Sequence, residues 1–391
     1  MNQKYNFDLV DRKGTSSLKY DARQDTFGRA DLIPLWVADM DFATAPAITN
    51  ALIERATHPV YGYTQYPESM FEALIDWIKR RHGWEVKREW IVMCPGVVPS
   101  IHAVVKALTK LEESVIVQPP VYFPFFSAVT DTRRSLIHNP LKLEENNYKF
   151  DFDHFEHCAS KARMLLLCSP HNPVGRVWSQ DELKTLLQIA KKHELIIFSD
   201  EVHADLIYAP HKHHMIAKIA DDSSNIITAI APSKTFNIAG LNLSVLIIPN
   251  ASHRIAVNSI FNDLHLSAAN PFSIVAFQAA YQNGEEWLNA ALDYLKESRD
   301  FVANYLINKL PQIKLVSPEG TYLLWLDCRA MAMTDSELKH FFVNIAGVGL
   351  SPGVQFGEAG SGFMRMNIGT SRQTISKALD KINAAFRHNA S

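Results

Sequence analysis

Short apolar segments alternate with helical segments from about residue 90 onward in this 391-residue chain, and this alternation limits the fold more than any other feature. The expected strands cover residues 90–93, 114–117, 164–168, 195–198, 226–230 and 244–248. Between them, the capping-box sequence Ser179-Gln180-Asp181-Glu182 predicts a helix that continues to about His193. Short apolar strands separated by helices predict an α/β fold, with a mostly parallel, seven-stranded type of sheet between layers of helices.

The pattern changes after about residue 285, where a smaller α+β domain is expected. Its predicted elements are a helix over residues 285–310 and strands over residues 320–327 and 363–368. A chain of 391 residues is also long for a single core. We therefore expect a large domain over residues 46–285 and a small domain formed by residues 1–45 and 286–391.

Composition and charge exclude several classes of partner. With 39 Lys and Arg against 41 Asp and Glu, the net charge of −2 gives no reason to expect a nucleic-acid or anionic-membrane partner. No apolar run approaches the roughly 18 residues of a membrane span, and no signal-peptide core follows the polar first residues. The cysteines, Cys94, Cys158, Cys168 and Cys328, lack metal-ligand or disulfide spacing. We expect a cytosolic protein with reduced thiols and no bound metal.

Lys234 is the first candidate for chemistry, because it stands in an unusually uncharged segment. Its neighbours from Ala231 to Gly240 are small, hydroxylated or apolar, and it is the only charge between Asp222 and Arg254. A lysine kept out of water holds its proton less tightly, so its free amine is more available. That is the property required of a lysine that forms a Schiff base.

Polar residues follow two of the predicted strands and complete a plausible site. Asp200 comes directly after an apolar strand, so its carboxylate needs a positive partner, and a protonated pyridine nitrogen would supply one. His203, three residues later, and Asn172, in a turn after another strand, can each donate to a phenolate-like oxygen. Because ligands bind beyond the carboxyl ends of parallel strands, these side chains are expected to converge.

Three further features suggest how a ring, a phosphate and a carboxylate could be held. Tyr122 can stack on the face of a ring. Val97 and Val98 follow Gly96 at the start of a predicted helix, where free backbone N–H groups can bind phosphate. Arg365 interrupts an otherwise apolar strand, and its guanidinium matches the geometry of a carboxylate.

Each candidate also has a structural interpretation. Asp200 can be a helix cap or a member of an ion pair, His203 a structural histidine, and Asn172 an ordinary turn residue. Arg365 can bridge to an acidic neighbour. For His211-Lys212-His213-His214, a solvated loop is favoured over a metal site, because no nearby carboxylate or cysteine completes one. The shared position after strands is what favours the functional interpretation.

Three motifs resemble the fold-type I pyridoxal-phosphate (PLP) enzymes of the class I/II aminotransferase superfamily. They are Asn172-Pro173-Val174-Gly175, Ser199-Asp200-Glu201-Val202-His203 and Ser233-Lys234-Thr235-Phe236-Asn237. Two more, Trp36-Val37-Ala38-Asp39-Met40-Asp41-Phe42 and Tyr61-Gly62-Tyr63-Thr64, resemble the MalY/PatB branch, whose members are cystathionine β-lyases, that is, C–S lyases. The resemblance covers nearly the whole chain.

The resemblance implies a role for each candidate. Lys234 would form the Schiff base with the cofactor, Asp200 would pair with its ring nitrogen, and Asn172 and His203 would contact its phenolic oxygen. Tyr122 would stack on the ring and border the substrate, and the phosphate would be bound by Val97, Val98, Ser233 and, from the neighbouring subunit of a homodimer, Tyr61. Arg365, with the backbone near Ala38, would bind the substrate α-carboxylate.

Two positions depart from the wider aminotransferase pattern. Ala231 stands where many relatives have serine, and Asn242 where many have arginine, so the phosphate lacks two common ligands. His203 replaces a tyrosine that is usual in aminotransferases, which favours the lyase branch. The implied reaction is cleavage of cystathionine or another cysteine S-conjugate to a thiol, pyruvate and ammonia. Transamination is the alternative within the family, and a regulatory protein that binds a transcription factor is an alternative of another class.

Overall fold

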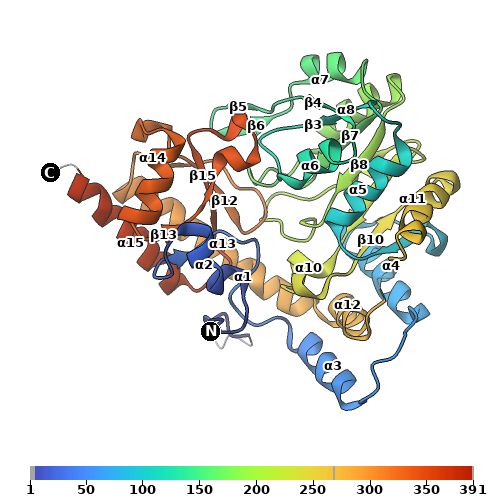
Figure 1. Ribbon diagram of the computed structural model, residues 1–391, viewed down its shortest axis with the longest axis horizontal. Coiled ribbons are helices and arrows are strands. Elements are labelled where there is room, and N and C mark those ends of the chain that lie inside the picture. The colour runs from blue at the N-terminus through green and yellow to red at the C-terminus, as the bar shows by residue number, and fades with distance from the viewer. Residues whose placement is uncertain (1–4, 267–268, 390–391) are drawn as a thin grey trace.

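A mixed sheet of seven strands forms the centre of the molecule in the computed structural model, which describes residues 5–266 and 269–389 (Figure 1). In spatial order its strands are β2 (Ile91–Cys94), β10 (Ser244–Ile247), β9 (Ile226–Ile230), β8 (Ile196–Asp200), β7 (Met164–Cys168), β3 (Ser114–Val117) and β4 (Ser135–His138). Only β10 runs antiparallel to its neighbours. The α/β class and the mostly parallel sheet are therefore confirmed. Strand β4 was not predicted, because it is a half-exposed strand at the sheet edge.

Alternate strand residues enter two different apolar cores, as a sheet covered on both faces requires. Val115 and Phe198 belong to one core, whereas Ile116 and Ile197 belong to the other. The helices contributing to the first core are α5 (Val97–Leu108), α6 (Pro124–Thr130) and α11 (Ala251–Asp263). Those contributing to the second include α3 (Pro46–Thr57), α4 (Glu68–His82), α7 (Phe152–Ala159), α8 (Gln180–Lys192), α9 (Ile216–Ile219) and α12 (Pro271–Asn283).

The carboxyl ends of three central strands are aligned by their register. Cys168 at the end of β7 pairs with Asp200 at the end of β8, and Asp200 pairs with Ala229 in β9. The chain then leaves β9 directly into the short helix α10 (Pro232–Thr235). As a result, the segments after these strands meet beyond the carboxyl ends of the central strands.

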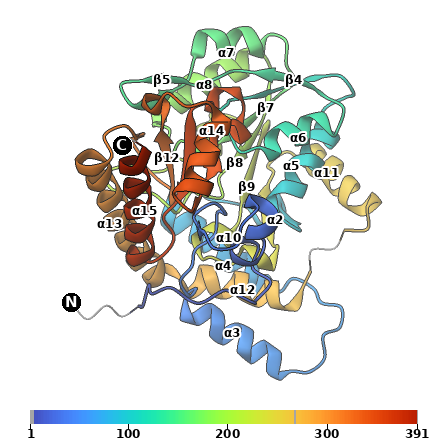
Figure 2. The same ribbon diagram turned by 60° about the vertical axis from the view of Figure 1, so that its left-hand side comes forward.

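A second, antiparallel sheet is built from the C-terminal part of the chain. In spatial order its strands are β11 (Lys314–Leu315), β12 (Leu323–Asp327), β15 (Phe363–Asn367) and β14 (Ser351–Pro352). The accompanying helices are α13 (Glu285–Lys309), α14 (Asp335–His340) and α15 (Arg372–Asn389), with α13 and α15 side by side (Figures 1 and 2). The capping box predicted at Ser179 is present, and a second capping box at Thr334 begins α14.

The N-terminal segment packs against this C-terminal part. Its helices are α1 (Leu18–Asp21) and α2 (Arg23–Phe27), and its strand β1 (Ile33–Pro34) pairs in parallel with β13 (Val348–Gly349). The hairpin of β5 (Lys142–Glu144) and β6 (Asn147–Lys149) completes the strands.

The division into domains at residues 45 and 285 stays a prediction. Within the described residues, none of the helices combines the length and apolar composition needed to span a bilayer.

Candidate active site

A cavity of about 780 Å³ opens where the central strands end. The segments following β2, β3, β7, β8 and β9 form one side, and the N-terminal segment and the C-terminal sheet form the other. The predicted site residues that line it are Ala38, Val97, Val98, Tyr122, Asn172, Asp200, His203, Ser233, Lys234 and Arg365. Residues that are up to 327 positions apart in sequence, Ala38 and Arg365, are thus brought together by the fold.

Lys234 lies in α10, and its amine reaches across the cavity to the N-terminal segment. Nζ donates a hydrogen bond to the backbone oxygen of Ala38 over 2.7 Å. Burial lowers the pKa of Lys234 to about 8, and the positive charge of Arg365 acts in the same direction. Asp39 and Asp200 oppose this change. The amine is therefore much easier to deprotonate than that of a solvated lysine.

Asp200 is a buried carboxylate at the end of β8. Burial raises its pKa to about 7, although a hydrogen bond from the backbone N–H of Val202 (3.3 Å) and the charge of Lys234 act against this. A carboxylate with such a raised pKa gains free energy from a cationic partner. A protonated ring nitrogen placed in the cavity would be a partner of this kind.

His203 faces the same cavity as a neutral side chain. Burial lowers its pKa to about 3, with Lys234 and Arg365 adding to the effect. Its Nδ1 atom is buried and has no hydrogen-bond partner among the residues that the structure describes. A buried polar atom without a partner is costly, so this atom favours a polar group bound beside it.

Arg365 extends from β15 and ties the C-terminal sheet to both other parts of the site. Its Nη1 donates to Asn172 Oδ1 over 3.1 Å, and its Nη2 donates to the backbone oxygen of Trp36 over 2.8 Å and to Ser351 Oγ over 3.3 Å. Burial lowers the pKa of Arg365 to about 10, and its buried Nε has no hydrogen-bond partner in the described part of the chain. An anionic ligand would compensate this charge. Because Asn172 Oδ1 is occupied by Arg365, its amide group is left to donate into the cavity.

The first turn of α5 also borders the cavity and offers backbone donors. Gly96 precedes this helix with φ +150°, a conformation that favours glycine. Pro99 has no N–H, so the first turn presents the N–H groups of Val97 and Val98. Ala231, Ser233, Asn242 and Ser244 line the same cavity. The phosphate-binding roles of Val97, Val98 and Ser233 stay predictions.

The two tyrosines occupy different environments. Tyr122 lines the cavity, and burial raises its pKa. Tyr61 does not line the cavity of its own chain: it is 56% exposed, its hydroxyl donates to the backbone oxygen of Ala56, and its ring packs on Phe272. Tyr63 in the same segment is exposed as well. The role of Tyr61 toward a neighbouring subunit stays a prediction.

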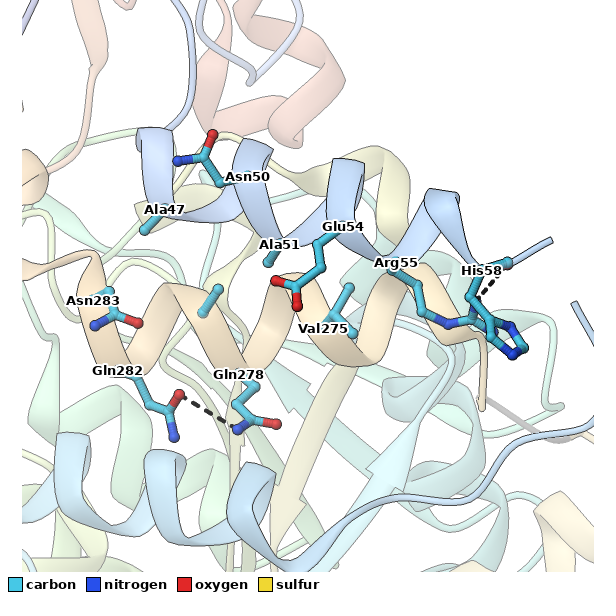
Figure 3. Close-up of a pocket in the computed structure, with 11 residues that line it drawn as sticks. Ala47, Asn50, Ala51, Glu54, Arg55, His58, Val275, Gln278, Gln282 and Asn283 are labelled. Atoms are coloured by element: carbon cyan, nitrogen blue, oxygen red, sulfur yellow. Dashed lines mark hydrogen bonds between the residues drawn. The ribbon is translucent and has the colours of Figure 1, made fainter. Parts of the chain in front are cut away.

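A second, shallower hollow of about 550 Å³ lies between α3 and α12 (Figure 3). Polar side chains from both helices border it, including Asn50 and Glu54 from α3 and Gln278 and Gln282 from α12. Gln278 and Gln282 hydrogen-bond to each other along α12. None of the predicted site residues borders this hollow.

The prediction of a solvated loop over residues 211–214 agrees with the exposure of His211 and Lys212 but is wrong for His213. This side chain is buried, and its Nε2 lies 2.6 Å from Glu201 Oε2, so a carboxylate does complete a pair. Glu201 belongs to the Asp200 motif, and the chain folds back on it, which sequence spacing does not reveal. Among the described residues, no group of three or more His, Cys, Asp or Glu side chains is arranged to hold a metal ion.

A buried network behind Lys234 was also missed. Asp205 accepts hydrogen bonds from Thr235 Oγ1 (3.1 Å) and from Trp77 Nε1 (3.3 Å), and lies 2.9 Å from His82 Nε2. Thr235 directly follows Lys234. Tyr322 was missed as well, although its hydroxyl donates to the same Ala38 oxygen as Lys234, over 3.0 Å. Nothing in the local sequence distinguishes these residues from ordinary core residues.

Together, the side chains fit PLP at each of its polar groups. Asp200 suits the ring nitrogen, the unpaired nitrogen of His203 and the amide of Asn172 suit the phenolic oxygen, and Lys234 suits the aldehyde. The N–H groups of Val97 and Val98 suit the phosphate. The substrate carboxylate is then left for Arg365.

Comparison with known proteins gives one consistent result. The family model described as aminotransferase class I and II matches residues 30–382. Cystathionine beta-lyase PatB from Bacillus subtilis is 40% identical over 385 residues, covering 97% of this chain and 100% of the relative.

Solved structures are similar to nearly the whole chain. A PLP-bound putative aminotransferase from Clostridium difficile has a TM-score of 0.96 and 42% identity, covering 97% of this chain and 99% of the other. The PLP-bound C-S lyase from Staphylococcus hominis has a TM-score of 0.91 and 34% identity, covering 98% of each chain.

Proposed function

This chain belongs to the aminotransferase class I and II family, and from that premise we propose that it is a PLP-dependent carbon–sulfur β-lyase. Its substrate is cystathionine or another cysteine S-conjugate, and its products are a thiol, pyruvate and ammonia, with one water consumed. For cystathionine the thiol is homocysteine. The names of the relative from Bacillus subtilis and of the lyase from Staphylococcus hominis support this reaction class.

One observation carries the proposal: Lys234 and Asp200 are buried in the same cavity with pKa values of about 8 and about 7. When bound, PLP supplies a protonated ring that withdraws electrons from the Cα atom of an amino acid. Asp200 holds the proton on the ring nitrogen. The neutral amine of Lys234 takes the proton from Cα.

Breaking the Cβ–S bond then requires a proton for the departing sulfur. The ammonium group of Lys234, which now carries the proton from Cα, is placed to deliver it. Arg365 binds the α-carboxylate of the amino acid. Its hydrogen bond to Asn172 holds that side chain in position to orient PLP and the amino acid. When PLP is bound, His203 and Asn172 would donate to its phenolic oxygen, Tyr122 would cover its ring, and Val97, Val98 and Ser233 would hold its phosphate.

The working protein in this proposal is a homodimer in which Tyr61 reaches the phosphate of the neighbouring site. Its exposed ring, in the irregular segment that follows α3, supports this placement. The large domain of residues 46–285 and the small domain of residues 1–45 and 286–391 then enclose each cavity between them. A cytoplasmic location is part of the proposal, supported by Cys94, Cys158, Cys168 and Cys328, which are all free thiols.

The rival reaction is transamination, favoured by the description of the Clostridium difficile neighbour as a putative aminotransferase. The two reactions share removal of the Cα proton and differ in where a proton returns. Incubation of the purified holoenzyme with cystathionine separates them. A lyase forms pyruvate and free thiol in equal amounts without a keto-acid acceptor. Formation of a new amino acid only when a keto acid is added would instead establish the aminotransferase.

The alternative of a regulatory protein that contacts a transcription factor has no supporting observation among the described residues. The proposal is therefore confined to catalysis. Pyruvate release by the purified chain alone, without any added protein, would agree with that restriction.

A further inference from the structure

The backbone oxygen of Ala38 accepts two hydrogen bonds from different parts of the chain. Lys234 Nζ in α10 donates to it over 2.7 Å, and the hydroxyl of Tyr322, just before β12, donates to it over 3.0 Å. A carbonyl oxygen has two lone pairs, so these two donors use its full capacity. The free amine of Lys234 is therefore held on an oxygen that Tyr322 also holds.

Tyr322 is itself held in place on several sides. Its side chain is fully buried, and its ring lies edge-on to that of His203, with centroids 6.3 Å apart. Its backbone oxygen accepts a hydrogen bond from the N–H of Ile368 over 2.9 Å, which ties it to the end of β15. A buried ring on a bound backbone has little freedom, so the hydroxyl reaches Ala38 from a fixed position.

The neighbouring carbonyls of the N-terminal segment are bound from the adjacent strand. Asn367, at the end of β15, donates through its amide to the backbone oxygens of the residues before and after Ala38. Asn367 pairs in register with Leu323, the residue that follows Tyr322. Two adjacent segments of the C-terminal sheet thus hold three consecutive carbonyls, and Tyr322 holds the one that Lys234 uses.

We propose that Tyr322 is a positioning residue for proton transfer at Cα: it fixes the Ala38 carbonyl, which in turn orients the free amine of Lys234. The inference rests on the proton-carrying role of Lys234 in the proposed function, and adds a residue that does not itself line the cavity. An amine with one N–H directed at a fixed oxygen has a restricted set of directions for its lone pair. Displacement of a reacting group by about 1 Å can lower a rate by orders of magnitude.

Exchange of the Cα proton of L-alanine in D2O, followed by proton NMR, tests the inference on the holoenzyme. Alanine has no group to eliminate from Cβ, so exchange reports removal of the Cα proton alone. Tyr322→Phe keeps the ring and deletes the hydroxyl. We expect it to lower kcat for exchange about tenfold and to change KM by less than about twofold, because Arg365 still binds the carboxylate.

An unchanged kcat for exchange in Tyr322→Phe overturns the inference. No exchange by the parent protein overturns it as well, because Lys234 then does not carry this proton. Pyruvate formation from cystathionine decides the lyase function separately, whichever result alanine gives.

Tyr208→Phe is the matched control for loss of a buried hydroxyl. The Tyr208 side chain is also buried, and its hydroxyl donates to a backbone oxygen, that of Thr321, over 2.6 Å. We expect the exchange kinetics of this variant to match those of the parent protein. An equal fall of kcat in both variants would show that general loosening of the segment before β12 sets the rate, and would overturn the role given to the Ala38 carbonyl.

Labelling of Lys234 in the full chain freed of PLP gives a readout that does not need the reaction. A trace of acetic anhydride at pH 7 modifies free amines, and mass spectrometry compares Lys234 with the exposed Lys110. A hydrogen bond to a fixed carbonyl favours the ammonium form, so its loss in Tyr322→Phe should raise the relative labelling of Lys234 several-fold. Unchanged labelling would show that the carbonyl keeps its place without the hydroxyl, and would also overturn the inference.

Discussion

The amine of Lys234 donates a hydrogen bond to the backbone oxygen of Ala38, 2.7 Å away, although 196 positions separate the two residues. This contact links α10, at the edge of the central sheet, to the N-terminal segment. The segment is fixed by side-chain amides: Asn367 donates to the backbone oxygens of Val37 and Asp39, and Asn237 donates to that of Met40. The position of the reactive amine therefore depends on the N-terminal segment as well as on the sheet.

Removing the lysine amine should abolish attachment of the cofactor. Lys234→Ala holoenzyme is expected to lose the visible absorbance of the Schiff base and all measurable pyruvate formation. Lys110→Ala, on an exposed lysine, is the matched control and should behave as the parent protein. Retention of the absorbance by Lys234→Ala would mean that another amine holds the cofactor.

The buried ion pairs of the N-terminal segment should contribute strongly to stability. Asp41 is fully buried and pairs with Lys19 at 3.0 Å and with Arg12 at 2.9 Å, and Lys19 is itself fully buried. Asp41→Asn leaves the Lys19 charge poorly compensated, and should lower the free energy of unfolding by about 3–5 kcal/mol. Asp31→Asn removes an exposed pair with Arg29, and should change the free energy of unfolding far less, because solvent screens that pair. Denaturant unfolding of both variants measures the difference.

Asp200 should destabilise the cofactor-free protein in a pH-dependent way. The pKa of Asp200 is about 7 in the folded state, against an ordinary value of 3.8 that also applies to the unfolded chain. Between pH 3.8 and 7 the carboxyl therefore binds more protons in the folded state than in the unfolded state. Stability conferred by the protonated carboxyl is present below pH 4 and lost as the pH rises through 7. Asp200→Asn does not titrate, so its advantage over the parent should grow across this interval, to roughly 4 kcal/mol.

Added PLP should act in the opposite direction, in favour of the parent protein over Asp200→Asn. The parent protein gains a charge partner for Asp200, whereas Asp200→Asn does not, so cofactor should stabilise the parent more. Thermal unfolding from pH 5 to 8, with and without PLP, measures both effects. Equal pH profiles for the two cofactor-free proteins would contradict the raised pKa.

The hydroxyl of Thr235 should help to hold Lys234 in place. It donates to the buried carboxylate of Asp205, which also links Trp77 and His82. Thr235→Val deletes the donor with little change of shape, and should cost about 1–3 kcal/mol of stability and lower kcat more than it raises KM. Thr235→Ser keeps the donor and should recover most of kcat. Loss of stability with unchanged kcat would limit this contact to folding.

Replacement of Arg365 should weaken substrate binding. Arg365→Lys keeps the charge but loses the planar fork, so KM for the amino acid should rise about tenfold or more. The variant also loses contacts to Asn172 and Trp36. The absorbance of its bound cofactor should therefore be compared with that of the parent protein. An unchanged KM would place the α-carboxylate elsewhere.

Much of the central sheet could be predicted from the sequence, because its strands are short and buried on both faces. The ranges 114–117, 164–168 and 226–230 agree with the observed strands to the residue. Strand β4 could not be predicted, since its half-exposed residues lack a continuous apolar run. Several candidate residues of the site could be predicted for a similar reason. Asn172 and Lys234 follow buried strands and Asp200 ends one, so these polar residues contrast with the apolar residues before them.

By itself, the sequence determined which strands are buried and which polar groups end them, because both are properties of neighbouring residues. Only the tertiary structure decided the partners of those groups. Ala38 with Lys234, Asn172 with Arg365, and Glu201 with His213 are contacts between segments whose approach depends on packing of the whole chain. The lowered pKa of Lys234 and the raised pKa of Asp200 were decided in the same way. Both shifts arise from burial. Lys234 and Asp200 are buried because the N-terminal segment and the C-terminal sheet pack over the ends of the strands.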